Sequence, residues 1–284
     1  MKKSIHFSLI IVLLAALVLS ACKTSNPPTD NSLHGMWYYT SSDEDVTGTS
    51  LLFDEDGLLT YRWVPDITQS VVIDWGGKEK SMTYTTANNK LCISYADALT
   101  EIYPQSLFEY TTDYTIQGNK LTINRFSWDG ERFAEVSLVA GEEVPKAGLS
   151  AQDKMRLEAI FTPENPYFHS DKVNEYNTCI VRSIEELQAM CPENVSLPEI
   201  DFSKECIVFS YIQVASVNYG LIGTTLYHNP LNDLYEYRIK IQRCSNCYDA
   251  IDHRVAYSVH AIPGNSIRYM TAIPLLKFYW QEEK

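Results

Sequence analysis

The amino-acid sequence predicts a mainly β protein, in which an N-terminal antiparallel β-barrel is followed by a smaller C-terminal α+β domain. Residues 37–139 form short segments of alternating polarity separated by turn residues, which is the pattern of an antiparallel meander. The 19 tyrosines favour strands over helices. A helical pattern followed by strands begins near residue 179, and a chain of 284 residues is long enough for two domains.

Residues 1–21 are predicted to be a lipoprotein signal peptide. Two lysines precede the apolar run Leu9–Leu19, which is too short to span a membrane comfortably. The run is followed by Ser-Ala-Cys22, and this sequence resembles the bacterial lipobox. The resemblance implies that Cys22 is lipidated and becomes the mature N-terminus. The alternative is an uncleaved helical anchor with an incidental cysteine, which the polar tract after Cys22 disfavours.

Residues 22–32 are predicted to be an extended tether, because they contain two prolines and no large apolar side chain. Some bacterial lipoproteins that reach the cell surface carry acidic residues just after the cysteine, whereas this tether has only Asp30. We therefore expect a lipid anchor in the bacterial outer membrane, with the periplasmic face favoured over the cell surface.

The net charge of −13 limits the partners that the protein can have. Nucleic acid is excluded as an expected partner, because phosphate binding needs clustered cations that release counterions. Anionic lipid is repelled for the same reason. The expected partners are the membrane through the lipid anchor, a small hydrophobic ligand and another protein of the cell envelope.

Alternation and turns define the predicted barrel strands. Within residues 58–63, Leu59, Tyr61 and Trp63 share one face of a strand. Residues that tolerate positive φ, as tight hairpins require, separate several of the segments. They are Asp56-Gly57, Asn88-Asn89 and Gly118-Asn119. The result is a meander of about eight strands, and closing it into a barrel removes two unpaired edges.

The first predicted strand carries Gly35 and Trp37, which resemble the Gly-x-Trp signature of the lipocalins. The segments LLFDEDGLLTY and YTIQGNKLTI resemble the lipocalin-like domains of bacterial lipoproteins. The resemblance covers residues 33–140 and implies that Trp37 closes the barrel floor. That family also has an arginine packed across the tryptophan, for which Arg125 and Arg132 are both candidates.

Four aromatic residues are candidates to line a ligand cavity in the barrel: Trp63, Tyr84, Tyr110 and Tyr114. Their rings could stack on a lipid, a sugar or another small apolar ligand. They could equally fill the interior, because an eight-stranded barrel has little room beyond its own side chains. The sequence leaves both interpretations open.

Residues 141–178 are predicted to be a junction with a short helix. Ser150 and Asp153 have the spacing of a helix N-terminus, and the proline-rich segment TPENP ends the helical pattern. Residues 179–284 are predicted to be the α+β domain. Its helix begins near Ser183 and Glu186, and β-rich segments follow.

This second domain resembles the C-terminal domain of protease-complex B-type subunits found in envelope lipoproteins. The matching segments are IVRSIEEL, Leu197-Pro198 before IDFSKECIVF, and AIPG. The similarity spans residues 179–274. It implies a small binding or accessory module, and it carries no catalytic residues over to this chain.

The pair Cys244 and Cys247 has the spacing of a redox or zinc motif. It follows a predicted strand rather than heading a helix, so the thiol pKa lacks the helix dipole that redox chemistry uses. Zinc ligation with His253 and His260 would need a different strand context. A disulfide at the end of a hairpin, or a pair of free thiols, is therefore expected, and no metal or cofactor is expected.

The sequence contains no Gly-x-Ser-x-Gly, P-loop or His-Glu-x-x-His motif. Asp252 and His253 are adjacent, but neighbouring residues of a strand or loop usually point apart, so a solvated pair is expected. We therefore expect no catalytic residues and a non-enzymatic function. The first interpretation is a lipoprotein that binds a small hydrophobic ligand or a protein partner. The alternative is an accessory or inhibitory subunit of an envelope enzyme, with a filled barrel as scaffold.

Overall fold

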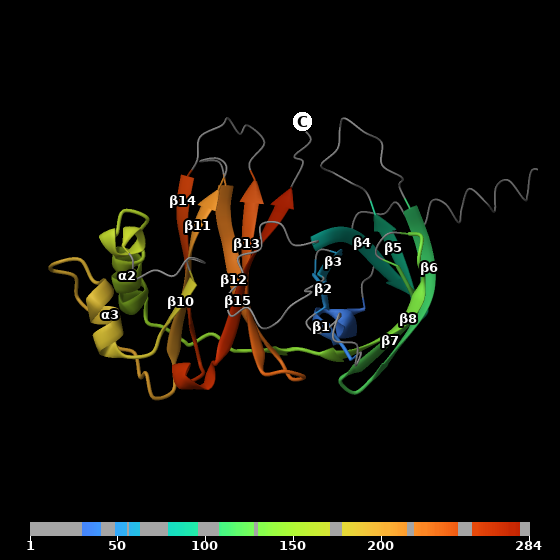
Figure 1. The fold of residues 1–284 in the computed structure, drawn as a ribbon, viewed down its shortest axis with the longest axis horizontal. Helices are drawn as coiled ribbons and strands as arrows, with labels where there is room; N and C mark the ends of the chain where they lie inside the picture. Colours follow the sequence, from blue (N-terminus) through green and yellow to red (C-terminus); the bar gives the residue numbers. More distant parts are fainter. Residues whose placement is uncertain are drawn as a thin grey trace, which may run out of the picture. The chain divides into compact units, whose positions relative to one another are not determined.

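The computed structural model describes residues 30–40, 49–55, 57–62, 79–95, 108–127, 130–170, 178–214, 219–243 and 252–278. These residues form two compact units, of which the first lies mainly within residues 30–138 and the second extends from Val139 (Figure 1). The predicted sites at Cys22, Trp63, Cys244 and Cys247 lie outside the described residues. The predicted mainly β fold is confirmed.

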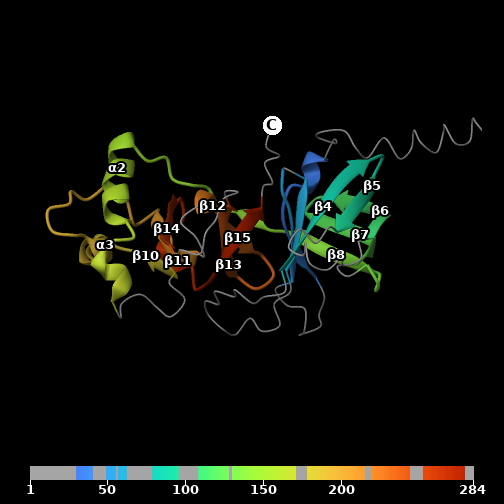
Figure 2. The ribbon, with the colours of Figure 1, turned by 90° about the horizontal axis from the view of Figure 1, so that it is seen from above.

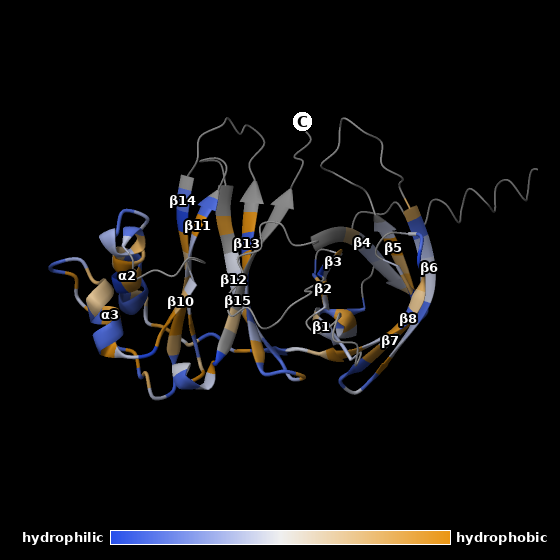
Figure 3. Cartoon of the chain, in the orientation of Figure 1, coloured by the Kyte–Doolittle hydropathy of each residue, from blue (hydrophilic) through white to orange (hydrophobic). Residues whose placement is uncertain are grey.

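The first unit is a closed barrel in which each strand pairs with its neighbours in the sequence. Its strands are β1 (Gly35–Tyr39), β2 (Ser50–Phe53), β3 (Leu58–Arg62), β4 (Glu79–Ala87), β5 (Lys90–Tyr95), β6 (Phe108–Gln117), β7 (Lys120–Phe126) and β8 (Ala134–Ala140). The prediction of an eight-stranded antiparallel barrel is thus confirmed. Hydrophobic and hydrophilic residues follow one another along these strands, as the colours of Figure 3 show.

The predicted hairpin residues adopt the backbone conformations that the turns require. Asn88 and Asn89, between β4 and β5, have φ angles of 52° and 59°. Two consecutive positive φ angles are the mark of a type I′ turn, whose twist matches that of the paired strands. Gly57 and Gly118 also have positive φ, at 78° and 62°. These positions explain how the chain reverses between short strands.

The second unit contains two sheets. The three-stranded sheet has the order β10 (Thr178–Val181), β11 (Cys206–Val214) and β14 (Asp252–His260). The four-stranded sheet has the order β15 (Tyr269–Phe278), β13 (Leu234–Arg243), β12 (Tyr219–Asn229) and β9 (Glu142–Glu143). The β13–β15 pair is parallel, whereas the other pairs are antiparallel.

The three-stranded sheet of this unit is buried on both faces. Alternate residues of β11, such as Cys206 and Val208, pack against the four-stranded sheet. The residues between them, such as Ile207 and Phe209, pack beneath the helices α2 (Ala151–Ile160) and α3 (Ile184–Met190). Helices, three-stranded sheet and four-stranded sheet therefore form three layers within this unit (Figure 2).

Both helices begin where the sequence predicts. The hydroxyl of Ser150 accepts a hydrogen bond from the backbone N–H of Asp153, and that of Ser183 accepts one from Glu186. Each serine satisfies a donor that the first helical turn would leave unpaired. Within the described ranges, neither helix has the length and hydrophobicity needed to span a lipid bilayer.

Candidate functional site

One end of the barrel is closed by the short 3₁₀ helix η1 (Asn31–Leu33). The indole Nε1 of Trp37 donates a hydrogen bond to the carbonyl oxygen of Leu33 at 2.8 Å, and both side chains are buried. Gly35 lies between them with a φ of 114°, a conformation that side chains larger than hydrogen rarely adopt. Gly35 and Trp37 therefore meet at the closed end.

Two of the predicted ligand-lining tyrosines also belong to this end. The Tyr84 hydroxyl donates to the carbonyl oxygen of Asp54 at 3.0 Å, and the Tyr114 hydroxyl donates to the Asp30 carboxylate at 2.8 Å. Hydrogen bonds from Ser32 hold the pKa of Asp30 below its usual value, whereas burial raises the pKa of Tyr114 to about 12. Both tyrosines thus bury their rings and bond their hydroxyls to the rim.

The barrel interior near the closed end is tightly packed. Cross-strand partners place the inward-facing side chains in one continuous set. Those exposed by 1% or less are Leu51, Phe53, Leu59, Met82, Tyr84, Leu91, Ile93, Leu121 and Ile123. Side chains buried to this degree leave no space for a water molecule beside them, so this part of the barrel is filled.

Aromatic rings gather toward the other end of the barrel. Tyr61 contacts Tyr39 and Phe126, and Tyr110 contacts Phe133, with ring centroids 4.9 to 6.5 Å apart. The ring of Tyr110 is half-buried, and burial raises its pKa to about 12. Tyr110 is thus the one member of the predicted ligand-lining set that the structure describes at this end.

The lipocalin resemblance implies an arginine packed across Trp37. Arg125, one of the two candidates, packs elsewhere. The Arg125 guanidinium lies over the ring of Phe133, with its carbon 3.9 Å from the ring centroid. This cation–π contact belongs to the aromatic end rather than to the floor at Trp37. Trp37 instead lies at the closed end, where its indole bonds to Leu33.

A polar network lies inside the second unit. Ser258 Oγ lies 2.7 Å from His260 Nε2 and 3.1 Å from the Tyr237 hydroxyl, while His260 Nδ1 lies 3.2 Å from the carbonyl oxygen of Val144. The carbonyl can only accept, so Nδ1 carries the proton and Nε2 accepts from Ser258. Burial lowers the pKa of His260 to about 4.

A serine beside a histidine also occurs in nucleophilic catalysis, but this pair has other surroundings. His260 is 0% exposed, and its second nitrogen faces a carbonyl rather than the carboxylate that orients a catalytic histidine. A substrate would have to separate the two sheets to reach Ser258. The geometry favours a structural network that satisfies buried polar groups. His253, the other histidine considered from the sequence, stacks on Tyr211 with ring centroids 5.3 Å apart.

Among the described residues, Cys179, Cys191 and Cys206 are free thiols. Burial raises the pKa of Cys206 to about 11 and also raises the pKa of Cys179 and Cys191. A raised pKa keeps the thiol protonated and therefore poorly nucleophilic. No group of three or more metal-ligating side chains is found among the described residues.

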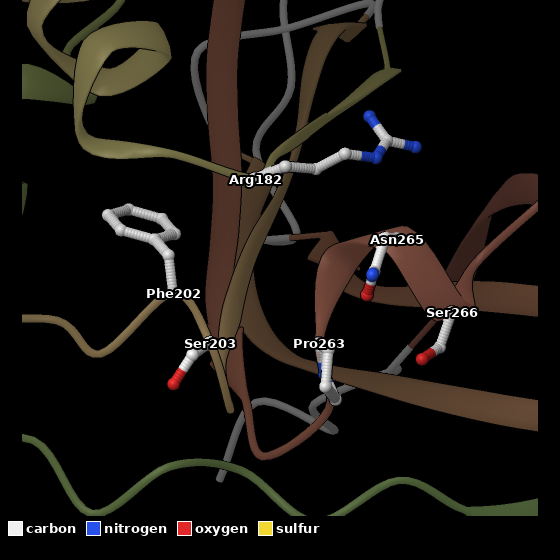
Figure 4. Close-up of a pocket in the computed structure, with 6 residues that line it drawn as sticks. All are labelled: Arg182, Phe202, Ser203, Pro263, Asn265 and Ser266. Carbon is white, nitrogen blue, oxygen red and sulfur yellow. The ribbon is translucent and has the colours of Figure 1, made fainter.

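The second unit has a surface hollow of about 520 Å³, which we call the Arg182 hollow (Figure 4). Its lining residues come from three parts of the chain that are distant in sequence, and they are Arg182, Phe202, Ser203, Pro263, Asn265 and Ser266. Arg182 follows β10, Phe202 and Ser203 precede β11, and Pro263 caps the 3₁₀ helix η4 (Gly264–Ser266). The hollow is therefore formed by three loops beside the three-stranded sheet.

The Arg182 side chain is fixed by backbone carbonyl groups. Its Nε donates to Gly264 at 3.2 Å, its Nη1 to Ile180 at 3.1 Å and its Nη2 to Ile267 at 3.4 Å. The Arg182 backbone N–H donates to the Glu186 carboxylate at 2.6 Å. These bonds connect the end of β10 to η4 and hold the guanidinium in one orientation.

Gly264 leaves the room that the Arg182 side chain occupies, because it has no Cβ atom. A Cβ atom at residue 264 would lie 2.6 Å from Cγ of Arg182 and 3.2 Å from Cβ of Cys206. The first distance is shorter than van der Waals contact allows, so any other residue would displace the arginine stem. The absence of a side chain at Gly264 is thus part of how the hollow is built.

The sequence did not single out Arg182, Asn265 or Ser266. The segments that carry the resemblance to protease-complex B-type subunits, however, contain Arg182, the Phe202-Ser203 pair and Pro263. The structure brings these segments together around the Arg182 hollow (Figure 4). The three segments that carry this resemblance were therefore the signal in the sequence that could have indicated the hollow. Only the structure shows that the three segments meet.

Comparisons with protein-family models, with curated proteins and with solved structures found no match. The two resemblances noted in the sequence therefore stay predictions.

Proposed function

We propose that the chain is a lipid-anchored, non-enzymatic protein of the bacterial cell envelope that binds a protein partner through its second unit. In this proposal the lipocalin-like barrel is a filled scaffold, and the Arg182 hollow is the contact surface. The protein would then serve as an accessory or inhibitory subunit, anchored in the outer membrane at Cys22 and facing the periplasm. No cofactor or metal takes part.

The contrast between the two units is the observation that supports this proposal. Inward-facing side chains at the closed end of the barrel leave no space for a ligand. The second unit instead has an open hollow with a fixed cation at Arg182 and partly buried apolar walls at Phe202 and Pro263. A charged anchor beside apolar surface is typical of sites where proteins recognise one another.

Photo-crosslinking in cells tests the contact surface. A photoreactive residue at Ser266, in the Arg182 hollow, should give a specific crosslinked band with an envelope protein, whereas the same residue at Asp113, on the barrel surface, should not. Bands of equal strength from both positions, or no band from Ser266, would contradict the proposal.

Lipid labelling tests the anchor. Cys22→Ser should abolish incorporation of labelled fatty acid and should release the processed protein from the membrane or leave the precursor uncleaved. Persistent labelling of the variant would show that another residue carries the lipid.

A second candidate function is binding of a small hydrophobic ligand at the aromatic end of the barrel. The half-buried ring of Tyr110 and its contact with Phe133 favour it, because exposed aromatic surface can stack on an apolar molecule. An apolar fluorescent probe distinguishes the candidates. Probe binding that Tyr110→Ala weakens would support the ligand, whereas absence of probe binding would favour the partner.

A further inference from the structure

The Arg182 guanidinium has donors to spare. An arginine side chain has five N–H groups, one on Nε and two on each terminal nitrogen. One N–H of each nitrogen is bonded to a carbonyl, at Gly264, Ile180 and Ile267. One donor therefore remains on each terminal nitrogen, and no partner for these two is found in the described part of the chain.

The charge of this guanidinium is also left without a carboxylate among the described residues. Glu186 accepts the backbone N–H of Arg182 rather than a guanidinium N–H, and Asp201, which precedes Phe202, pairs with Lys204 at 2.8 Å. In a chain of net charge −13, a fixed and unpaired cation is a site where one negative charge is favoured. Two free donors on one guanidinium match the two oxygens of a carboxylate.

A single carboxylate fits this site better than a phosphate group. Phosphate recognition uses clustered cations, because the group carries more than one negative charge. The Arg182 hollow has one cation in its lining, and the net charge of −13 on the whole chain disfavours a polyanion. The charge balance therefore selects a monoanion.

The remaining lining determines what the carboxylate belongs to. Pro263 provides an apolar wall, and Asn265 provides an amide that can pair with a peptide group. The Phe202 ring points away from the Arg182 guanidinium and packs against the core beneath the helices (Figure 4). A ligand that uses the guanidinium, Pro263 and Asn265 needs a carboxylate, an apolar group and a backbone amide. A C-terminal residue with an apolar side chain is the smallest peptide unit that has all three.

We infer that the Arg182 hollow binds the C-terminal carboxylate of a partner peptide whose last residue is apolar. Arg182 pairs with the carboxylate, and Pro263 contacts the last side chain. The inference rests on the proposed function, because it specifies which part of the protein partner binds to the second unit. Capture of a terminal carboxylate is a recurring mode of peptide recognition.

Three small probes test the ligand class against the purified, exported protein in ligand-observed NMR titrations. They are acetyl-alanyl-leucine, the same dipeptide with a C-terminal amide, and acetyl-aspartyl amide, whose carboxylate is on a side chain. The free acid should bind roughly tenfold or more tightly than either of the others, because it alone forms the charge-assisted pair and the apolar contact. Equal binding of the acid and its amide would overturn the inference, as would absence of binding by the acid. Equal binding of acetyl-aspartyl amide would overturn the assignment to a chain terminus.

Variants test the role of Arg182 itself. Arg182→Lys keeps the charge but loses the planar fork, so it should weaken binding of the acid roughly tenfold. Gly264→Ala should weaken it too, because the new Cβ displaces the arginine stem. The matched control is Arg268→Lys, an exposed arginine near the same turn, which should bind like the parent. Parent-like binding by Arg182→Lys and Gly264→Ala together would overturn the assignment. The probe comparison on the parent protein needs no variant, so misfolding of a variant does not leave the inference untested.

The crosslinking at Ser266 tests whether a protein partner binds, whereas the titrations test whether the hollow binds a terminal carboxylate, so either result can be obtained without the other. A specific crosslink without preference for the free acid would leave the protein-binding function standing and overturn only the carboxylate. Preference for the free acid without a crosslink would support the site and contradict the proposed partner.

Discussion

The barrel and the second unit bury tyrosines in two different ways. In the barrel, Tyr84 and Tyr114 keep their rings inside and bond their hydroxyls to groups at the rim. In the second unit, the Tyr237 hydroxyl lies in the interior and bonds to Ser258, which also bonds to His260. Tyr84 and Tyr114 lie near the closed end of the barrel, whereas Tyr237 lies between two packed sheets. The interior of the second unit therefore needs its own polar network, and that network contains a titratable group.

Truncating Trp37 should cause the largest loss of stability in the barrel. Trp37→Ala removes a buried indole and its hydrogen bond to Leu33, so we expect a loss of about 3 to 5 kcal/mol in the free energy of unfolding. Urea denaturation monitored by circular dichroism measures it. The comparison is Trp63→Ala, which should leave the melting temperature nearly unchanged if Trp63 lines an accessible mouth. Equal losses at both tryptophans would contradict the distinction between floor and mouth.

Acid should weaken the second unit through His260. The unfolded histidine has a pKa near 6.5, and burial lowers the folded value to about 4. The neutral form thus stabilises the fold fully above about pH 6.5, and this contribution is lost as the pH falls toward 4. The full difference is about 3 kcal/mol.

Unfolding measured from pH 7 to pH 4 checks this expectation, with His260→Gln as the control. The variant keeps a polar side chain but cannot titrate, so its stability should fall less steeply than that of the parent. Parallel curves for the two proteins would show that His260 is not the sensitive group. Such a result would also weaken the contrast between the two interiors.

Removing single hydroxyls sharpens the contrast directly. Tyr114→Phe should cost about 1 kcal/mol, because Asp30 lies at the rim and keeps its bonds from Ser32. The same change at Tyr237 should cost more. It removes one of the hydrogen-bond partners of the Ser258 hydroxyl, which is buried away from any water that could replace that partner. Thermal denaturation of both variants checks the order. A larger loss at Tyr114 would reverse the proposed difference.

The smallest effect is expected on the barrel surface. Lys90 and Asp113 form an ion pair at 2.5 Å, with side-chain exposures of 53% and 55%. Water and salt screen such a pair, so Asp113→Asn should change the free energy of unfolding by about 0.5 kcal/mol or less. Measurements at low and high salt check it, and a loss above 1 kcal/mol would contradict the exposed character of the pair.

Much of the barrel could be predicted because its determinants are local. Asn88-Asn89 predicts a turn whatever surrounds it, and Ser150 and Ser183 predict helix starts from a spacing of three residues. Alternation places Leu59 and Tyr61 on one face of a strand, and the structure pairs them with Phe53 and Leu51 of β2. These features require no knowledge of distant partners.

The Arg182 hollow and the His260 network could not be predicted in this way. Arg182 meets Gly264 across 82 residues, and His260 meets Val144 across 116. Each contact depends on which strands pair and in which register, which alternation does not determine. Ser258 and His260 are separated by two residues of a strand, so their shared face is local, but their burial between two sheets is not.

The parallel pairing of β15 with β13 has a consequence for the order in which the protein folds. Apart from the contact of β1 with β8 that closes the barrel, the barrel strands pair with their neighbours in the sequence, so a chain that emerges N-terminus first can complete the barrel before the second unit. In the four-stranded sheet, β13 gains its second neighbour only when Tyr269–Phe278, close to the end of the chain, has emerged. Until then one edge of β13 is open to pairing with other chains. A truncation that removes β15 should therefore produce aggregation during synthesis rather than a merely less stable protein.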